Sequence, residues 1–73
     1  MILFEEKMLD ANKIFSAEII DHFNSKKVYY NSILMIHFLP EMKIPHIDFD
    51  YKTHEEALSK LNQLVTLINL QRK

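Results

Sequence analysis

The 73-residue sequence contains no cysteine and no glycine. Without cysteine the chain can form neither a disulfide framework nor a thiolate metal cage, so its stability must come from a hydrophobic core or from association. Without glycine it has no phosphate-cradling loop and no glycine-flanked nucleophile elbow. We therefore expect its turns to be made by Asn, Asp and Pro.

A charge excess of one sign and a long apolar run are lacking too. Nine Lys and Arg stand against ten Asp and Glu, and neither sign forms a block, which weakens the case for nucleic-acid binding. The longest apolar run, "SILMIHFL", is far below the roughly 18 residues of a membrane span. The first residues, "MILFEEKMLD", place glutamates where a secretory signal has basic residues. We expect a cytoplasmic protein with no membrane partner.

Hydrophobic residues are abundant for so short a chain, at 48%. A chain of this length forms one domain, 1–73, and buries a smaller share of its surface than a larger domain does. We therefore expect some apolar surface to be covered by another chain.

The C-terminal part predicts an amphipathic helix. It begins at the capping box "THEE", in which Thr53 and Glu56 bond each other's backbone amides. Leu67 and Leu70 fall outside its apolar stripe. The stripe consists of Ala57, Leu58, Leu61, Leu64, Val65 and Ile68.

Two segments upstream predict β-strands. Residues 28–39 are apolar on both faces, which is typical of a central strand. One face carries Val28, Tyr30, Leu34, Ile36 and Phe38, and the other carries Tyr29, Ile33, Met35 and Leu39. Residues 46–51 alternate, with Ile47, Phe49 and Tyr51 inward and His46, Asp48 and Asp50 outward.

Residues 8–23 fit either a strand or a helix. We favour strands at 2–9 and 14–22, joined by a turn with Asn12 in the left-handed region. The predicted fold class is therefore α+β: an antiparallel β-meander of three to four strands, with the C-terminal amphipathic helix packed on one face.

One helix covers one sheet face, so the other face needs another chain to cover it. We expect a second copy, in a homodimer, or a target protein to cover it. The expected interface residues are Tyr29, Ile33, Met35, Leu39, Leu67 and Leu70.

A metal site would use His46, Asp48 and Asp50, with His37 or His54 as a further ligand. Strand neighbours i and i+2 lie about 6.5–7 Å apart, so convergence on one ion is difficult. We favour a solvated strand face. None of the serines has a nucleophile motif, and we expect no enzyme activity, no catalytic residues and no cofactor.

A second hypothesis is a small nucleic-acid- or nucleotide-binding module. A basic turn beside aromatic residues can hold a single strand. The residues for such a contact are Lys26, Lys27, Tyr29 and Tyr30.

The stretches "SILMIHF", "HIDFDYKTHEEA" and "LNQLVTLI" give residues 28–70 a resemblance to very small strand-strand-helix proteins of low-GC Gram-positive bacteria and their phages or mobile elements. The resemblance implies a non-enzymatic role, such as inhibition of a host defence system or host enzyme, or accessory regulation. The leading hypothesis is thus an intracellular protein that acts by protein-protein interaction.

Overall fold

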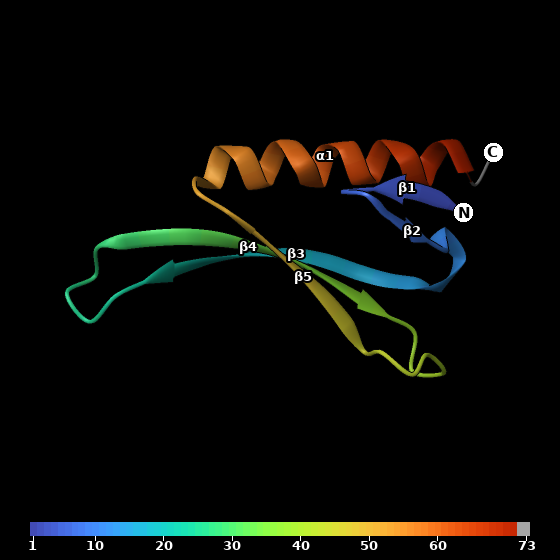
Figure 1. Cartoon of the computed structure of the whole chain (residues 1–73), viewed down its shortest axis with the longest axis horizontal. Coiled ribbons are helices and arrows are strands. Elements are labelled where there is room, and N and C mark those ends of the chain that lie inside the picture. The colour runs from blue at the N-terminus through green and yellow to red at the C-terminus, as the bar shows by residue number, and fades with distance from the viewer. Residues whose placement is uncertain (72–73) are drawn as a thin grey trace.

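The computed structural model describes residues 1–71, and it has two antiparallel sheets and one helix (Figure 1). Strands β1 and β2 pair with each other, and β3, β4 and β5 form the second sheet in that order. The elements are β1 (Ile2–Phe4), β2 (Lys7–Leu9), a 3₁₀ turn (Ala11–Lys13), β3 (Ile14–Phe23), β4 (Tyr29–Phe38), β5 (His46–Tyr51) and α1 (His54–Gln71). The predicted α+β class, with one C-terminal helix packed on a sheet, is confirmed.

The prediction of a single strand over residues 2–9 is wrong, because the chain reverses at Glu5 and Glu6. Both residues have positive φ angles, 51° and 65°, and two left-handed residues in a row form a tight hairpin turn that usually favours Asn-Gly. Asn12 is not left-handed. It lies in the 3₁₀ turn, where its N–H donates to Asp10 Oδ1 at 3.0 Å. In a chain without glycine, glutamates therefore make the first turn.

The long β3–β4 hairpin contains two β-bulges. Ile14 pairs with Phe38 but Ser16 pairs with His37, which leaves Phe15 as an extra residue in β3. At the other end Tyr30 is extra in β4. A bulge shifts the side-chain alternation by one residue.

Tyr29 consequently lies on the helix side of the sheet, where its hydroxyl is 2.6 Å from Ser32 Oγ. The predicted face that grouped Tyr29 with Ile33 and Met35 is wrong for Tyr29 for this reason.

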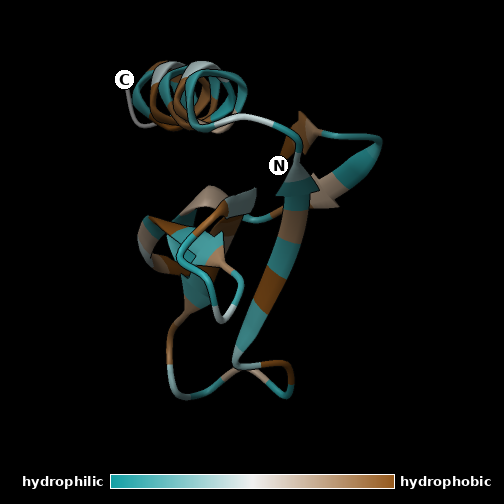
Figure 2. Ribbon diagram, turned by 90° about the vertical axis from the view of Figure 1, so that its left-hand side faces the viewer, coloured by the Kyte–Doolittle hydropathy of each residue, from teal (hydrophilic) through white to brown (hydrophobic). Residues whose placement is uncertain are grey.

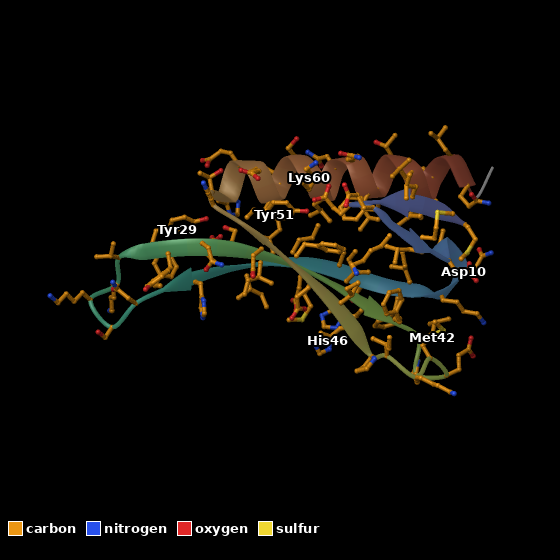
Figure 3. All side chains as sticks on the ribbon, viewed as in Figure 1. Asp10, Tyr29, Met42, His46, Tyr51 and Lys60 are labelled. Atoms are coloured by element: carbon orange, nitrogen blue, oxygen red, sulfur yellow. The ribbon has the colours of Figure 1, made fainter. Side chains whose placement is uncertain are left out.

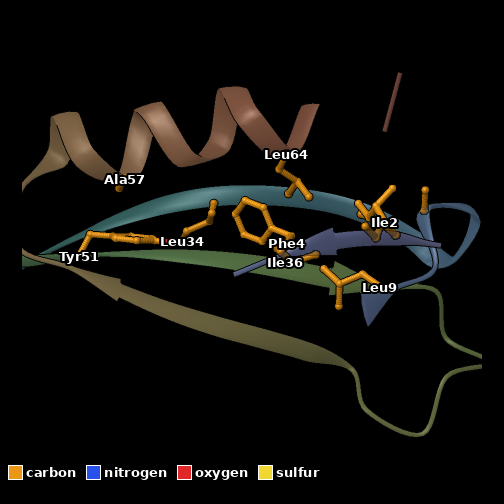
Figure 4. Close-up of a cluster of buried hydrophobic side chains, with 10 residues drawn as sticks. Ile2, Phe4, Leu9, Leu34, Ile36, Tyr51, Ala57 and Leu64 are labelled. Carbon is orange, nitrogen blue, oxygen red and sulfur yellow. The ribbon is translucent and has the colours of Figure 1, made fainter. Parts of the chain in front are cut away.

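The core lies between α1 and the strands (Figure 4), and Figure 2 shows α1 nearly end-on as a separate layer above them. The β1–β2 hairpin contributes to this core, with Phe4 packed edge-on against Phe49 at 5.4 Å. The buried apolar residues are Ile2, Phe4, Leu9, Ala11, Ile14, Leu34, Ile36, Tyr51, Ala57 and Leu64.

Helix α1 begins as predicted, with the Glu56 N–H donating to Thr53 Oγ1 at 3.1 Å. Its buried side is rotated from the predicted stripe. Leu67 packs against the core, whereas Leu58 and Val65 are 43% and 46% exposed. The expectation that Leu67 has no cover within the chain is wrong, because α1 packs on β1 as well as on the larger sheet.

Candidate functional site

The β3–β4 hairpin extends beyond the start of α1, and we call its residues 22–31 the arm (Figure 1). Phe23, Val28 and Tyr30 are 54%, 56% and 69% exposed. The rings of Phe23 and Tyr29 meet edge to face at 5.9 Å. The arm therefore presents aromatic and aliphatic side chains away from the core.

Lys26 and Lys27 lie in the loop at the tip of the arm. Asn24 holds this loop, because its side-chain oxygen accepts from the N–H groups of Lys26 at 2.9 Å and Val28 at 3.0 Å. Lys27 donates its N–H to the Asn24 carbonyl at 2.9 Å and has a φ of 60°. The loop thus places two exposed cations at one extreme of the molecule.

A chain of polar side chains ties the base of the arm to the start of α1. Tyr29 contacts Ser32, the Ser32 hydroxyl donates to Asp21 Oδ1 at 2.6 Å, and His54 Nδ1 lies 2.9 Å from the same oxygen. The hydrogen bond from Ser32, with a second from His54, lowers the pKa of the Asp21 carboxyl. The hydrogen bond to Asp21 and its negative charge raise the pKa of His54.

These residue types are those of a Ser-His-Asp triad, but the geometry is different. Ser32 is fully buried, and it bonds the carboxylate of Asp21 directly instead of bonding His54. A triad requires the histidine to take the serine proton. The cluster therefore positions the arm relative to α1.

We call the side of the β3–β4–β5 sheet opposite α1 the helix-free face. Cross-strand pairing sets its members in rows. They are Ser16, Glu18, Ile20, His22, Asn31, Ile33, Met35, His37, His46, Asp48 and Asp50. His37 Nε2 lies 3.0 Å from Glu18 Oε1, and the rings of His37 and His46 are 6.1 Å apart. His46 points away from α1 in Figure 3.

Within residues 1–71 no three His, Asp or Glu side chains are arranged to hold a metal ion. His46 is 3.9 Å from Asp48, while Asp50 lies in the next row, near Asn31. His54, considered as a further ligand, instead bonds Asp21. The ligand set considered from the sequence is therefore not assembled.

A hollow of about 720 Å³ lies at the other end of the molecule from the arm. Figure 3 places Asp10 and Met42 at this end, opposite Tyr29. The apolar lining consists of Met1, Met8, Leu9, Phe38, Met42, Ile44 and Ile47, and the charged lining consists of Lys7, Asp10, Lys13, Glu41 and Lys43. Cavities of roughly 300–1,000 Å³ are the size of ligand sites.

Two of the charges around the hollow remain uncompensated within the described chain. Lys13 pairs with Glu41, and Asp10 caps the 3₁₀ turn. Lys7 and Lys43 form no ion pair with any of residues 1–71. The hollow is therefore apolar inside with two available cations at its edge.

The structure does not bring the six expected interface residues together. Ile33 and Met35 share the helix-free face, whereas Leu39 follows β4 and donates its N–H to the Lys13 carbonyl at 2.9 Å. Leu70 is 62% exposed near the end of α1. Tyr29 and Leu67 lie on the helix side, as described above.

Sequence reasoning missed the hollow. Met8 and Met42 are far apart in the chain, and Ile44 lies in a segment that reads as a simple connection. They meet only because residues 41–44 and β2 line the same hollow in the folded chain. Their shared property, an exposed apolar side chain, is too weak a signal to locate a site from sequence.

No helix within residues 1–71 is long and apolar enough to cross a membrane. No family model matches the chain, and no curated protein or solved structure shows significant similarity to it.

Proposed function

We propose that this chain is a non-enzymatic interaction protein and that its hollow binds an apolar side chain of a partner protein. The observation that carries the proposal is the hollow itself, about 720 Å³ and lined by three methionines. Methionine is flexible and polarizable, so it adapts to the shape of an inserted side chain and is common at binding surfaces.

The charges at the edge of the hollow favour a partner segment with acidic residues. Lys7 and Lys43 are the cations not already paired within the described residues. Charge complementarity of this kind contributes more to specificity and association rate than to affinity. The occupant is thus a segment with a large apolar side chain beside Asp or Glu.

The proposal retains the cytoplasmic location expected from the sequence. Inhibition of a host defence system or host enzyme by a phage or mobile-element protein remains a proposal about the identity of the partner. The hollow supports the protein-binding role that all of these partners share.

Selection from a displayed random-peptide library tests the binding proposal. We expect enriched peptides to combine a large apolar residue with neighbouring acids, and we expect Met8→Asp with Ile44→Asp to abolish their binding. Leu3→Asp with Leu70→Asp is the matched control, because these leucines are equally exposed, at 60% and 62% against 58% and 62%, but do not line the hollow. Binding that survives in the hollow variant, or is lost equally in the control, contradicts the proposal.

The arm supports the second hypothesis, nucleic-acid binding, through one observation. Residues 22–31 contain no Asp or Glu, and they carry Lys26, Lys27 and the 69% exposed Tyr30 together. Fluorescence anisotropy with a single-stranded oligothymidylate tests it. Lys26→Glu with Lys27→Glu should weaken binding and flatten its salt dependence, and an unchanged affinity removes this function.

A further inference from the structure

The helix-free face is acidic, and the arm tip beyond it is basic. Glu18 and Asp48 lie on either side of Met35, because both are its cross-strand partners. None of β3, β4 and β5 contains Lys or Arg. The other end of the same hairpin is the arm tip, with Lys26 and Lys27 and no acidic residue.

Exposed aliphatic side chains lie between these two groups of charges. Ile20 pairs with Ile33 in the row next to Met35, and Ile20 is 38% exposed. Val28 lies one residue beyond the Phe23–Tyr29 pair toward the arm tip, so alternation places it on the helix-free side. It is 56% exposed. Asp50 flanks Ile33 in β5, and the polar row of His22 and Asn31 follows. Along the hairpin the surface therefore runs from acidic rows, past exposed aliphatic groups, to the basic tip.

Such a surface is complementary to itself when one copy is turned by 180°. We propose that a second copy of this chain binds the helix-free face in an antiparallel, two-fold arrangement, with the arm tip of each copy against Glu18 and Asp48 of the other. A two-fold interface requires the same patch on both partners to match itself. The three carboxylates of this face make a nucleic acid a poor alternative occupant.

The spacing along the strands fixes where the two-fold axis lies. An antiparallel strand rises about 3.4 Å per residue, so the eight residues from Glu18 to Lys26 span roughly 27 Å. The midpoint is the row in which His22 pairs with Asn31. Rotation about an axis through this row sets the row of Ile20 and Ile33 against the partner's row of Asn24 and Val28, so the exposed aliphatic groups cover each other.

Charge exchange between two variants tests the arrangement by sedimentation equilibrium at low salt. One variant carries Lys26→Glu with Lys27→Glu, and the other carries Glu18→Lys with Asp48→Lys. Each alone should dissociate at least about tenfold more readily, because every tip contact becomes repulsive. Mixed in equal amounts they should form a heterodimer, since both tip contacts become attractive again.

Lys7→Glu with Lys43→Glu is the control for net charge, because both lysines line the hollow at the other end of the molecule from the arm tip, and its dimer should match the wild type. Circular dichroism checks that every variant is folded. A monomeric wild type at submillimolar concentration overturns the proposal. So does a Glu18→Lys, Asp48→Lys variant that dimerises normally, or a mixture that stays monomeric.

A crosslink on the proposed axis provides a second measurement, which the absence of cysteine makes simple. Packed sheets lie about 10 Å apart, beyond the span of a disulfide, so a short bismaleimide is the appropriate reagent. His22→Cys should crosslink efficiently to its own copy, and the exposed Leu3→Cys should not. Equal crosslinking of the two contradicts the arrangement. Neither experiment depends on the hollow, so a negative result for the dimer leaves the proposed function standing.

Discussion

Replacing Lys27 by glycine should stabilise the protein, whereas replacing its neighbour Lys26 should not. Lys27 has a φ of 60°, and Lys26 is not among the positive-φ residues. A left-handed conformation costs a residue with a Cβ about 1–2 kcal/mol. Glycine removes that cost but adds about 0.4–1 kcal/mol of unfolded-state entropy to be lost on folding. The net expectation for Lys27→Gly is a gain of about 0.5–1 kcal/mol.

Lys26→Gly is the matched control, because it removes the same charge from the same exposed loop. It has only the entropic term, so it should destabilise the protein by about 0.4–1 kcal/mol. Each kcal/mol corresponds to about 4–8 °C in melting temperature at this chain length. Thermal unfolding followed by circular dichroism should therefore move the two midpoints in opposite directions. Midpoints that shift together in one direction would refute the assignment of strain to Lys27.

Three further changes test other parts of the structure. Glu6→Gly should raise the free energy of unfolding by about 0.5–1 kcal/mol, because Glu6 is also left-handed. The 3.0 Å Glu5–Lys60 ion pair remains in this variant. A lower free energy of unfolding in urea contradicts this prediction. The Tyr51 hydroxyl is buried without a hydrogen-bond partner among the described residues, and its burial, together with nearby Glu5, raises its pKa. Tyr51→Phe should therefore stabilise the protein by about 1 kcal/mol, and a comparable loss would mean that the hydroxyl is satisfied. Because the pKa of His54 is raised and that of Asp21 is lowered, their contact contributes fully to the free energy of unfolding between about pH 4 and 6.5. It is lost as pH rises through the folded pKa of His54, and as pH falls through that of Asp21. The stability difference between wild type and His54→Gln should thus shrink above about pH 6.5, and a flat difference contradicts the linkage.

Local chemistry made the C-terminal half predictable. Residues 46–51 alternate cleanly, and the observed β5 has those bounds. Thr53 offers the right side chain just before a long apolar periodicity, and α1 begins at the next residue. These signals depend on neighbouring residues alone, so a sequence displays them fully.

The features that were missed depend on distant parts of the chain. Nothing in the type of Glu5 or Glu6 favours a left-handed turn, which is held instead by the packing of β1 and by the pairing of Glu5 with Lys60. The bulge at Tyr30 cannot be read from a run of residues that suits a regular strand. The hollow, similarly, exists only because two segments remote in the sequence line the same space in the folded chain.

The two bulges make the number of residues in the hairpin matter more than their identity. Phe15 is 72% exposed and Tyr30 is 69% exposed, so neither contributes much burial. Substitutions at these positions should be well tolerated. Deletion of Phe15, by contrast, would turn Ile14 out of the core, and deletion of Tyr30 would carry Tyr29 and the rest of the arm to the opposite side. In related sequences, insertions and deletions should therefore be excluded from positions that accept almost any side chain.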